Sequence, residues 1–349
     1  MAMDKNAIVV LGMHRSGTSA LTGVLTLLGA DPGPSLIPAV EGINPKGFWE
    51  HKEIVSIHDQ LLEEYGTSWD DGTSLPSGWW LSSITMTARN KIISIVRRDF
   101  SASPLWIIKD PRMCRLLPLW HEVLRELALQ PLFVISVRNP AEVARSLRKR
   151  DGLGEELSCL LWLTHILDAE FQTRGQRRVF VSYQNLLSNW RETMGNISQT
   201  LRVTWPVSID DAGLSVDEFL DPALRHHDGS VSLQDHLACN LAQKAFELLS
   251  TQSPDPAELD LLRMRTDELV RLVAPWSMHL RNRDKVIRQH GHLQAQNLAL
   301  EHEMSRMKDY ISDIRSSFSW KLLIPVRILE NLLRRTFSSS VIDNSKVGE

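Results

Sequence analysis

The segment formed by residues 8–25, IVVLGMHRSGTSALTGVL, has the residue types of a phosphate-binding loop. Gly12 and Gly17 have the spacing of the G-x-x-x-x-G-K-[ST] motif, but Thr18 stands where that motif has lysine. A basic residue, Arg15, lies inside the loop instead. A strand, a glycine turn and a helix N-terminus together offer backbone N–H groups to an anion, and an arginine in the turn can neutralise a single phosphate. The sequence therefore predicts a site for a phosphate-bearing ligand. The missing lysine argues against hydrolysis of a nucleoside triphosphate.

A second candidate anion site lies in FVISVRNPAEVARS, where Arg138 follows an apolar run and Ser146 comes eight residues later. Pro140 suits the first turn of a helix. We therefore expect Arg138 at the carboxyl end of a strand and Ser146 two turns into the next helix. There the guanidinium can fork onto a phosphate while the serine hydroxyl reaches the same anion.

These two motifs, in this order, resemble those of sulfotransferases that use 3′-phosphoadenosine 5′-phosphosulfate (PAPS). GMHRSGTSAL is similar to their 5′-phosphosulfate loop in the variant with arginine for lysine, as in tyrosylprotein sulfotransferases and many bacterial members. RNPAEVARS is similar to their 3′-phosphate motif, and the resemblance runs from about Ala7 to Leu187. It implies PAPS as donor substrate, no metal, and these donor-binding residues: Gly12, His14, Arg15, Ser16, Gly17, Thr18, Ser19, Arg138, Ser146 and, from a late loop that could also be a solvated turn, Arg225.

Two further segments supply candidates for the chemistry. WIIKDPRM resembles the strand-end segment of carbohydrate sulfotransferases whose lysine approaches the phosphosulfate, so Lys109 and Arg15 are expected to stabilise the leaving phosphate. A hydroxyl acceptor also needs a base. INPKGFWEHKEI makes Glu50 the first candidate by the same resemblance and His51 its rival, while Glu50 could also be an ordinary carboxylate at a helix start.

The elements that must position these residues follow from short apolar runs separated by helical patterns. The runs at residues 8–11, 105–108, 131–137 and 178–182 read as buried parallel strands. Strands that alternate with helices predict an α/β fold, a doubly wound parallel sheet of the P-loop nucleotide-binding type. We expect this domain to cover residues 1–277.

A C-terminal helical, coiled-coil extension is predicted for residues 278–318 because apolar residues repeat there in heptads. One seam holds Val286, Leu293, Leu300, Met307 and Ile314; the other holds His290, Asn297, Met304, Ile311 and Phe318. The helix could form a homo-oligomer or pack on its own domain. Residues 319–349 are predicted to be a basic amphipathic tail with a disordered end, and Trp320 lies near its start. The tail could contact an anionic membrane, a partner or the domain itself.

Composition narrows the function classes. A net charge of -3 argues against nucleic acid as a partner, and three cysteines without metal-ligand spacing favour a reducing compartment. Apolar runs are too short for a membrane span, so an integral membrane protein is not expected. A cytoplasmic protein is expected, and contact of the tail with an anionic membrane would place it at the inner face of the membrane. The predicted function is sulfuryl transfer to a hydroxyl of a carbohydrate, such as a polysaccharide, or of a glycolipid-like acceptor. The alternatives are a small-molecule or nucleotide kinase with a degenerate loop, and a non-catalytic scaffold that acts through its coiled coil.

Overall fold

The computed structural model describes residues 6–41, 44–220, 233–251 and 254–316. Within the last range, the side chains of residues 275–299 and 314–316 lie outside the description. The candidate donor contact Arg225 and the tail 319–349 therefore also lie outside the described residues. The chain divides into two compact units, Met1–Ser277 and Met278–Glu349.

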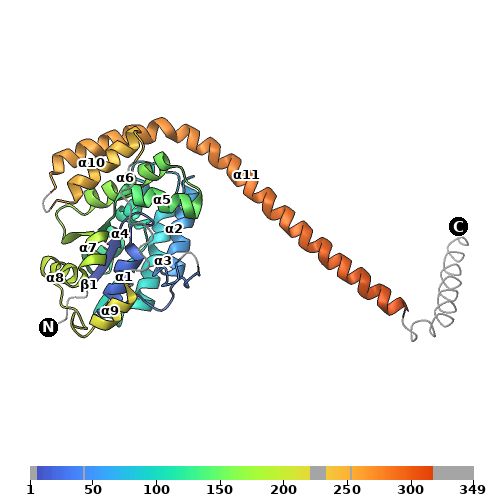
Figure 1. Cartoon of the computed structure of the whole chain (residues 1–349), viewed down its shortest axis with the longest axis horizontal. Helices are drawn as coiled ribbons and strands as arrows, with labels where there is room; N and C mark the ends of the chain where they lie inside the picture. Colours follow the sequence, from blue (N-terminus) through green and yellow to red (C-terminus); the bar gives the residue numbers. More distant parts are fainter. Residues whose placement is uncertain (1–5, 42–43, 221–232, 252–253, 317–349) are drawn as a thin grey trace, which may run out of the picture. The chain divides into compact units, whose positions relative to one another are not determined.

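The first unit, in which Figure 1 labels β1, is built on a four-stranded parallel sheet, and the order of its strands is β2-β1-β3-β4. The strands are β1 (Asn6–Leu11), β2 (Leu105–Lys109), β3 (Gln130–Val137) and β4 (Arg178–Ser182). The strands β1, β2 and β3 are nearly continuous in apolar residues because both of their faces are buried, whereas β4 at the edge of the sheet buries only Val181. The four predicted strands are thus confirmed, as is their parallel pairing.

Helices cover both faces of the sheet, so the predicted doubly wound architecture is confirmed. Alternate residues of β1 enter two separate cores: Val9 and Leu11 join one, Ile8 and Val10 the other. The core of Ile8 and Val10 is closed by α1 (Thr18–Leu27), α7 (Tyr183–Ser188), α8 (Trp190–Leu201) and α9 (Gly213–Phe219). The core of Val9 and Leu11 is closed by α2 (Lys52–Glu64), η1 (Trp79–Leu81), α3 (Ser83–Phe100), α4 (Met113–Glu126), α5 (Pro140–Asp151), α6 (Glu155–Gln172), α10 (Leu237–Leu249) and the start of α11 (Pro256–Ser316).

The strand order sets the position of the site. From β1 the chain runs first to β2 on one side and then to β3 on the other, so β1 lies at a topological switch point. In open α/β sheets, ligands bind outside the carboxyl ends of the strands at such a point. The phosphate-loop motif follows β1, Lys109 ends β2, and Arg138 follows β3. The topology therefore brings the predicted residues to one edge.

The second unit consists, in its described part, of the continuation of α11, which ends at Ser316. A coiled coil is not shown. Of the predicted seams, Leu300, Met304, Met307 and Ile311 are described, and all four side chains are exposed. No helix among the described residues is long and apolar enough to cross a membrane.

Candidate active site at the carboxyl ends of the strands

The loop after β1 has a backbone that its neighbours hold in place. Gly12 has a φ of 144° and donates its N–H to the Cys114 sulfur at 3.1 Å. The Ser136 hydroxyl donates to the carbonyl of Ser16 at 2.8 Å. Gly17, with a φ of 86°, precedes α1 without a side-chain cap, and a Cβ there would lie 2.0 Å from the Tyr183 ring. An uncapped helix start beside a fixed glycine turn is the geometry that binds anions.

Arg15, Ser146 and Arg138 meet on one side of this loop. Arg15 Nε donates to the Ser146 hydroxyl at 2.8 Å, and Arg138 Nη1 donates to the Arg15 carbonyl at 3.0 Å. The Arg138 guanidinium also lies over the Tyr183 ring, 4.4 Å from its centre, and pairs with Glu142 at 2.8 Å. The predicted loop and the predicted strand-end motif are therefore joined directly by side-chain and backbone contacts.

Three arginines, Arg15, Arg138 and Arg150, gather positive charge beside this loop, and Arg15 is partly buried. Burial, and then the charges of Arg150 and Arg138, lower the pKa of Arg15 from its ordinary value. An arginine stays protonated at neutral pH despite such a shift. The cluster can therefore offer cationic hydrogen-bond donors to a phosphate.

Lys109 and Glu50 form a buried ion pair on the other side of the loop. Lys109 Nζ donates to Glu50 Oε1 at 2.5 Å, to the Phe48 carbonyl at 2.8 Å and to the Ser19 hydroxyl at 3.0 Å. The side chains of Lys109 and Glu50 are 2% and 8% exposed. The other oxygen of Glu50, Oε2, is buried and has no hydrogen-bond partner among the described residues. The carboxylate is thus oriented through one oxygen only.

The environment of Glu50 makes it a stronger base than an exposed glutamate. Burial raises its pKa from the ordinary value of 4.5, and the positive charge and hydrogen bond of Lys109 oppose part of that rise. A basic carboxylate beside a lysine that can face a leaving group is an arrangement suited to group transfer onto a hydroxyl.

An unusual backbone at Trp49 allows Lys109 to contact both neighbours of that residue. Trp49 has a φ of 66°, in the left-handed region that bulky residues rarely adopt. On either side, the Phe48 carbonyl and the Glu50 carboxylate both accept hydrogen bonds from Lys109. The Glu50 carbonyl is fixed in turn by the Ile37 N–H at 2.8 Å.

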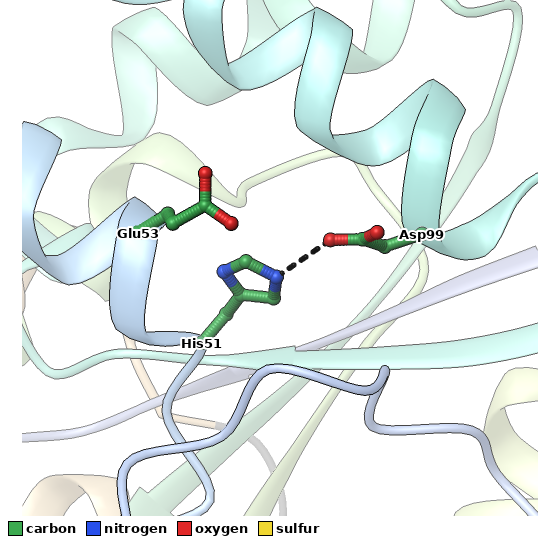
Figure 2. Close-up of side chains that lie close together, drawn as sticks. All are labelled: His51, Glu53 and Asp99. Atoms are coloured by element: carbon green, nitrogen blue, oxygen red, sulfur yellow. Dashed lines mark hydrogen bonds and ion pairs between the residues drawn. The ribbon is translucent and has the colours of Figure 1, made fainter.

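His51 faces a different cluster (Figure 2). Its Nε2 lies 2.9 Å from Asp99 Oδ2 on α3, and its side chain is fully buried. His51, Glu53 and Asp99 are the one group of described residues with the spacing of metal ligands. Arg98 already pairs with both carboxylates, at 2.6 Å to Glu53 and 2.7 Å to Asp99. His51 therefore contacts Asp99 rather than the partners of Glu50. The positive charge beside the two carboxylates is the Arg98 guanidinium.

His14 packs on an aromatic residue of another loop. Its ring lies against Trp69, with centroids 4.2 Å apart, and burial, followed by the charge of Arg112, lowers its pKa well below the ordinary value of 6.5. Trp69 lies in the irregular segment between α2 and η1. Asp71 holds this segment, accepting hydrogen bonds from the Thr67 hydroxyl and the Ser68 N–H at 2.7 and 2.9 Å. His14 thus connects the loop after β1 to the loop between α2 and η1.

Asp110, which directly follows β2 and is the nearest approach in this chain to a magnesium-binding aspartate at a strand end, has both oxygens engaged. His58 Nδ1 lies 2.7 Å from Oδ2, while the N–H and Nη1 of Arg112 each lie 3.0 Å from Oδ1. Burial alone would raise the pKa of Asp110, but Arg112 and His58 outweigh it and the net shift is downward. Trp120 donates to the remaining nitrogen of His58 at 2.9 Å. This buried chain of polar contacts is a structural one.

No protein-family model matches the chain, and neither does any curated protein. Similar solved structures do exist. The sulfotransferase domain of the Synechococcus PCC 7002 olefin synthase is 19% identical over 70% of this chain and 95% of that one, with a TM-score of 0.42. That of the curacin biosynthetic pathway is 13% identical over 75% and 97% of the two chains, and the Mycobacterium avium sulfotransferase STF9 is 14% identical over 71% and 76%, each with a TM-score of 0.36.

The chain resembles sulfotransferases of known structure.

The structure brings six of the predicted site residues into two groups of contacts around the loop. Arg15, Ser146 and Arg138 form one, and Ser19, Lys109 and Glu50 form the other. His14 and His51 lie outside both. Sequence reasoning missed Tyr183, whose ring supports Arg138 and excludes any Cβ at Gly17. Its place directly after β4 was the available signal.

Replacing Lys109 by Met should lower the free energy of unfolding by about 3–5 kcal/mol, because it leaves the buried Glu50 carboxylate unpaired. Adding Glu50→Leu should recover most of that loss, since an apolar pair needs no compensating charge. The same substitution at Lys244, which forms an exposed pair with Glu258, should cost less than about 1 kcal/mol. Denaturant unfolding measures all three, and equal losses for Lys109→Met and Lys244→Met would contradict the description of the pair.

Proposed function

We propose that the protein is a PAPS-dependent sulfotransferase that transfers a sulfuryl group to a hydroxyl of a carbohydrate or glycolipid-like acceptor. One observation carries the proposal: a buried Lys109–Glu50 pair stands beside a phosphate-binding loop that has no lysine of its own. The lysine supplies the charge that the loop lacks, and the carboxylate supplies the base that a hydroxyl acceptor needs. One ion pair thereby provides both the positive charge for the leaving phosphate and the base for the acceptor.

The donor is expected to lie across the two groups of residues. Its 5′-phosphate would bind the N-terminus of α1 through the backbone of Gly17 and Thr18, and its 3′-phosphate would bind Arg138 and Ser146. The contact between Arg15 Nε and the Ser146 hydroxyl, 2.8 Å long, supports this assignment because it links the two phosphate positions.

Transfer then follows from the positions of the charges. The bond between sulfur and the bridging phosphate oxygen breaks, its electron pair stays on the phosphate, and a new bond forms between sulfur and the acceptor oxygen. Arg15 and Lys109 stabilise the negative charge that grows on the phosphate. Glu50 Oε2, buried and without a partner in the described part of the chain, takes the proton of the acceptor hydroxyl.

The acceptor class is proposed from the loop that contains Trp69. This half-buried indole packs on His14 beside the phosphate loop, with the Arg150 guanidinium 5.4 Å from its ring centre, and the half-buried side chains of Ser68 and Asp70 lie in the same segment. An aromatic surface with a few convergent polar groups suits a ligand that has apolar faces and many hydroxyls. A saccharide has both properties.

The two alternative functions fit the site less well. A kinase would need a lysine at Thr18 and a carboxylate free to hold magnesium, whereas both oxygens of Asp110 are engaged. A non-catalytic scaffold would gain nothing from an unpaired buried oxygen on Glu50, which costs stability. A cytoplasmic location and membrane contact through residues 319–349 stay predictions from the sequence.

Adenosine 3′,5′-bisphosphate should bind saturably without added magnesium, and Arg138→Ala should weaken binding by about 2–5 kcal/mol, the scale of a truncated buried charge contact. Arg125→Ala, on the exposed end of α4, is the matched control and should leave the affinity unchanged. Isothermal titration calorimetry measures both. A requirement for magnesium, or a preference for ATP over the bisphosphate, would favour the kinase.

Glu50→Gln should reduce turnover by roughly 100-fold or more, the usual scale of general-base catalysis, while the bisphosphate affinity stays nearly unchanged. Glu53→Gln removes a carboxylate three residues away on α2 and should have little effect. Since the base acts when ionised and burial raises its pKa, wild-type kcat/KM should rise with pH through a value above 4.5. A silent Glu50→Gln combined with an inactive His51→Asn would reverse the assignment.

A further inference from the structure

The last described turns of α11 carry an apolar stripe on one side of the helix. Leu300, Met304, Met307 and Ile311 are 57%, 59%, 63% and 44% exposed, and successive members are spaced by four, three and four residues. This spacing returns side chains to the same face of a helix, as in a heptad repeat. Large apolar side chains aligned in this way on an exposed helix mark an interaction surface.

We propose that this stripe is the seam of a parallel, two-stranded coiled coil formed with a second copy of the chain. Met304 and Ile311 take the a positions, and Leu300 and Met307 take the d positions. A β-branched residue at a, with leucine at d, favours two strands over three or four. The seam residues are therefore consistent with a dimer.

The charges beside the seam identify the partner as an identical chain in parallel orientation. Glu303 occupies a g position, and Lys308 occupies the e position that comes five residues later. In a parallel pair in register, the g residue of one helix lies beside the following e residue of the other. Each Glu303 then meets the partner copy's Lys308, and the symmetry of the dimer makes the contact twice.

An antiparallel arrangement loses this complementarity, because g then faces g and e faces e. Both Glu303 and Lys308 are exposed, and neither forms an ion pair with another residue of the described ranges. The two side chains are therefore available to a second chain.

The first test exchanges the charges in the full-length protein. Glu303→Lys or Lys308→Glu turns both attractive contacts into repulsive ones and should raise the dimer dissociation constant roughly 10-fold at low salt, the scale of a few exposed charge pairs. The double variant restores opposite charges and should return the constant to the wild-type value. Analytical ultracentrifugation measures each. A monomeric wild type, or a double variant that is no better than either single one, would overturn the proposal.

The second test determines orientation. Met307→Cys places two thiols face to face in a parallel pair, within the range that a disulfide spans, and mild oxidation should give a covalent dimer. Asp309→Cys, on the outer side of the helix, is the control and should give little. The native cysteines Cys114, Cys159 and Cys239 are buried and add little background. A dimer that fails to cross-link through Met307→Cys would contradict the parallel seam.

These tests are independent of the proposed sulfuryl transfer. The substituted positions are exposed residues of the second unit, so donor binding should remain unchanged in every variant.

Discussion

The buried ion pair between Lys109 and Glu50 is the interaction on which the site depends. A single ammonium group at the end of β2 holds the Ser19 hydroxyl of α1, the Phe48 carbonyl and the Glu50 carboxylate. Such a pair contributes little net stability, because removing two charges from water offsets most of their attraction. Its value lies in position: it fixes a lysine beside the loop that follows β1 and a carboxylate next to that lysine. These are the two groups to which the proposed transfer assigns the leaving phosphate and the acceptor proton.

The strained backbone of the site is likewise held by contacts from Arg138 and Lys109. Arg15 and Trp49 both adopt left-handed conformations, with φ of 67° and 66°, at a cost of about 1–3 kcal/mol each. Such conformations persist when several contacts with the surrounding structure hold them in place. Arg138 holds the Arg15 carbonyl, and Lys109 binds the residues on both sides of Trp49. At these two positions lie the Arg15 guanidinium, which donates to Ser146, and the Glu50 carboxylate that follows Trp49 and accepts from Lys109.

Sequence reasoning predicted the strands and the convergence of the motifs well, because buried parallel strands are almost continuously apolar and strand ends meet at one edge. It identified Lys109 and Glu50 separately but did not predict their contact, which depends on the backbone conformation of Trp49. A positive φ at a tryptophan cannot be predicted from the residue type. His14 was placed in the donor site by its position in the motif alone. Its side chain follows Trp69, a contact between distant segments that local spacing does not encode. The heptads predicted the apolar stripe on α11. Its partner is not predicted by the fold of one chain, because the stripe is exposed there.

The most direct test of the account follows the sulfur atom. Purified protein would be incubated with sulfur-labelled PAPS and saccharide, glycolipid and phenolic acceptors, with γ-phosphate-labelled ATP in a parallel reaction. The account predicts that label moves to the saccharide or glycolipid fraction, with one adenosine 3′,5′-bisphosphate released for each label transferred. Transfer of phosphate from ATP, or intact donor in the presence of every acceptor class, would contradict it.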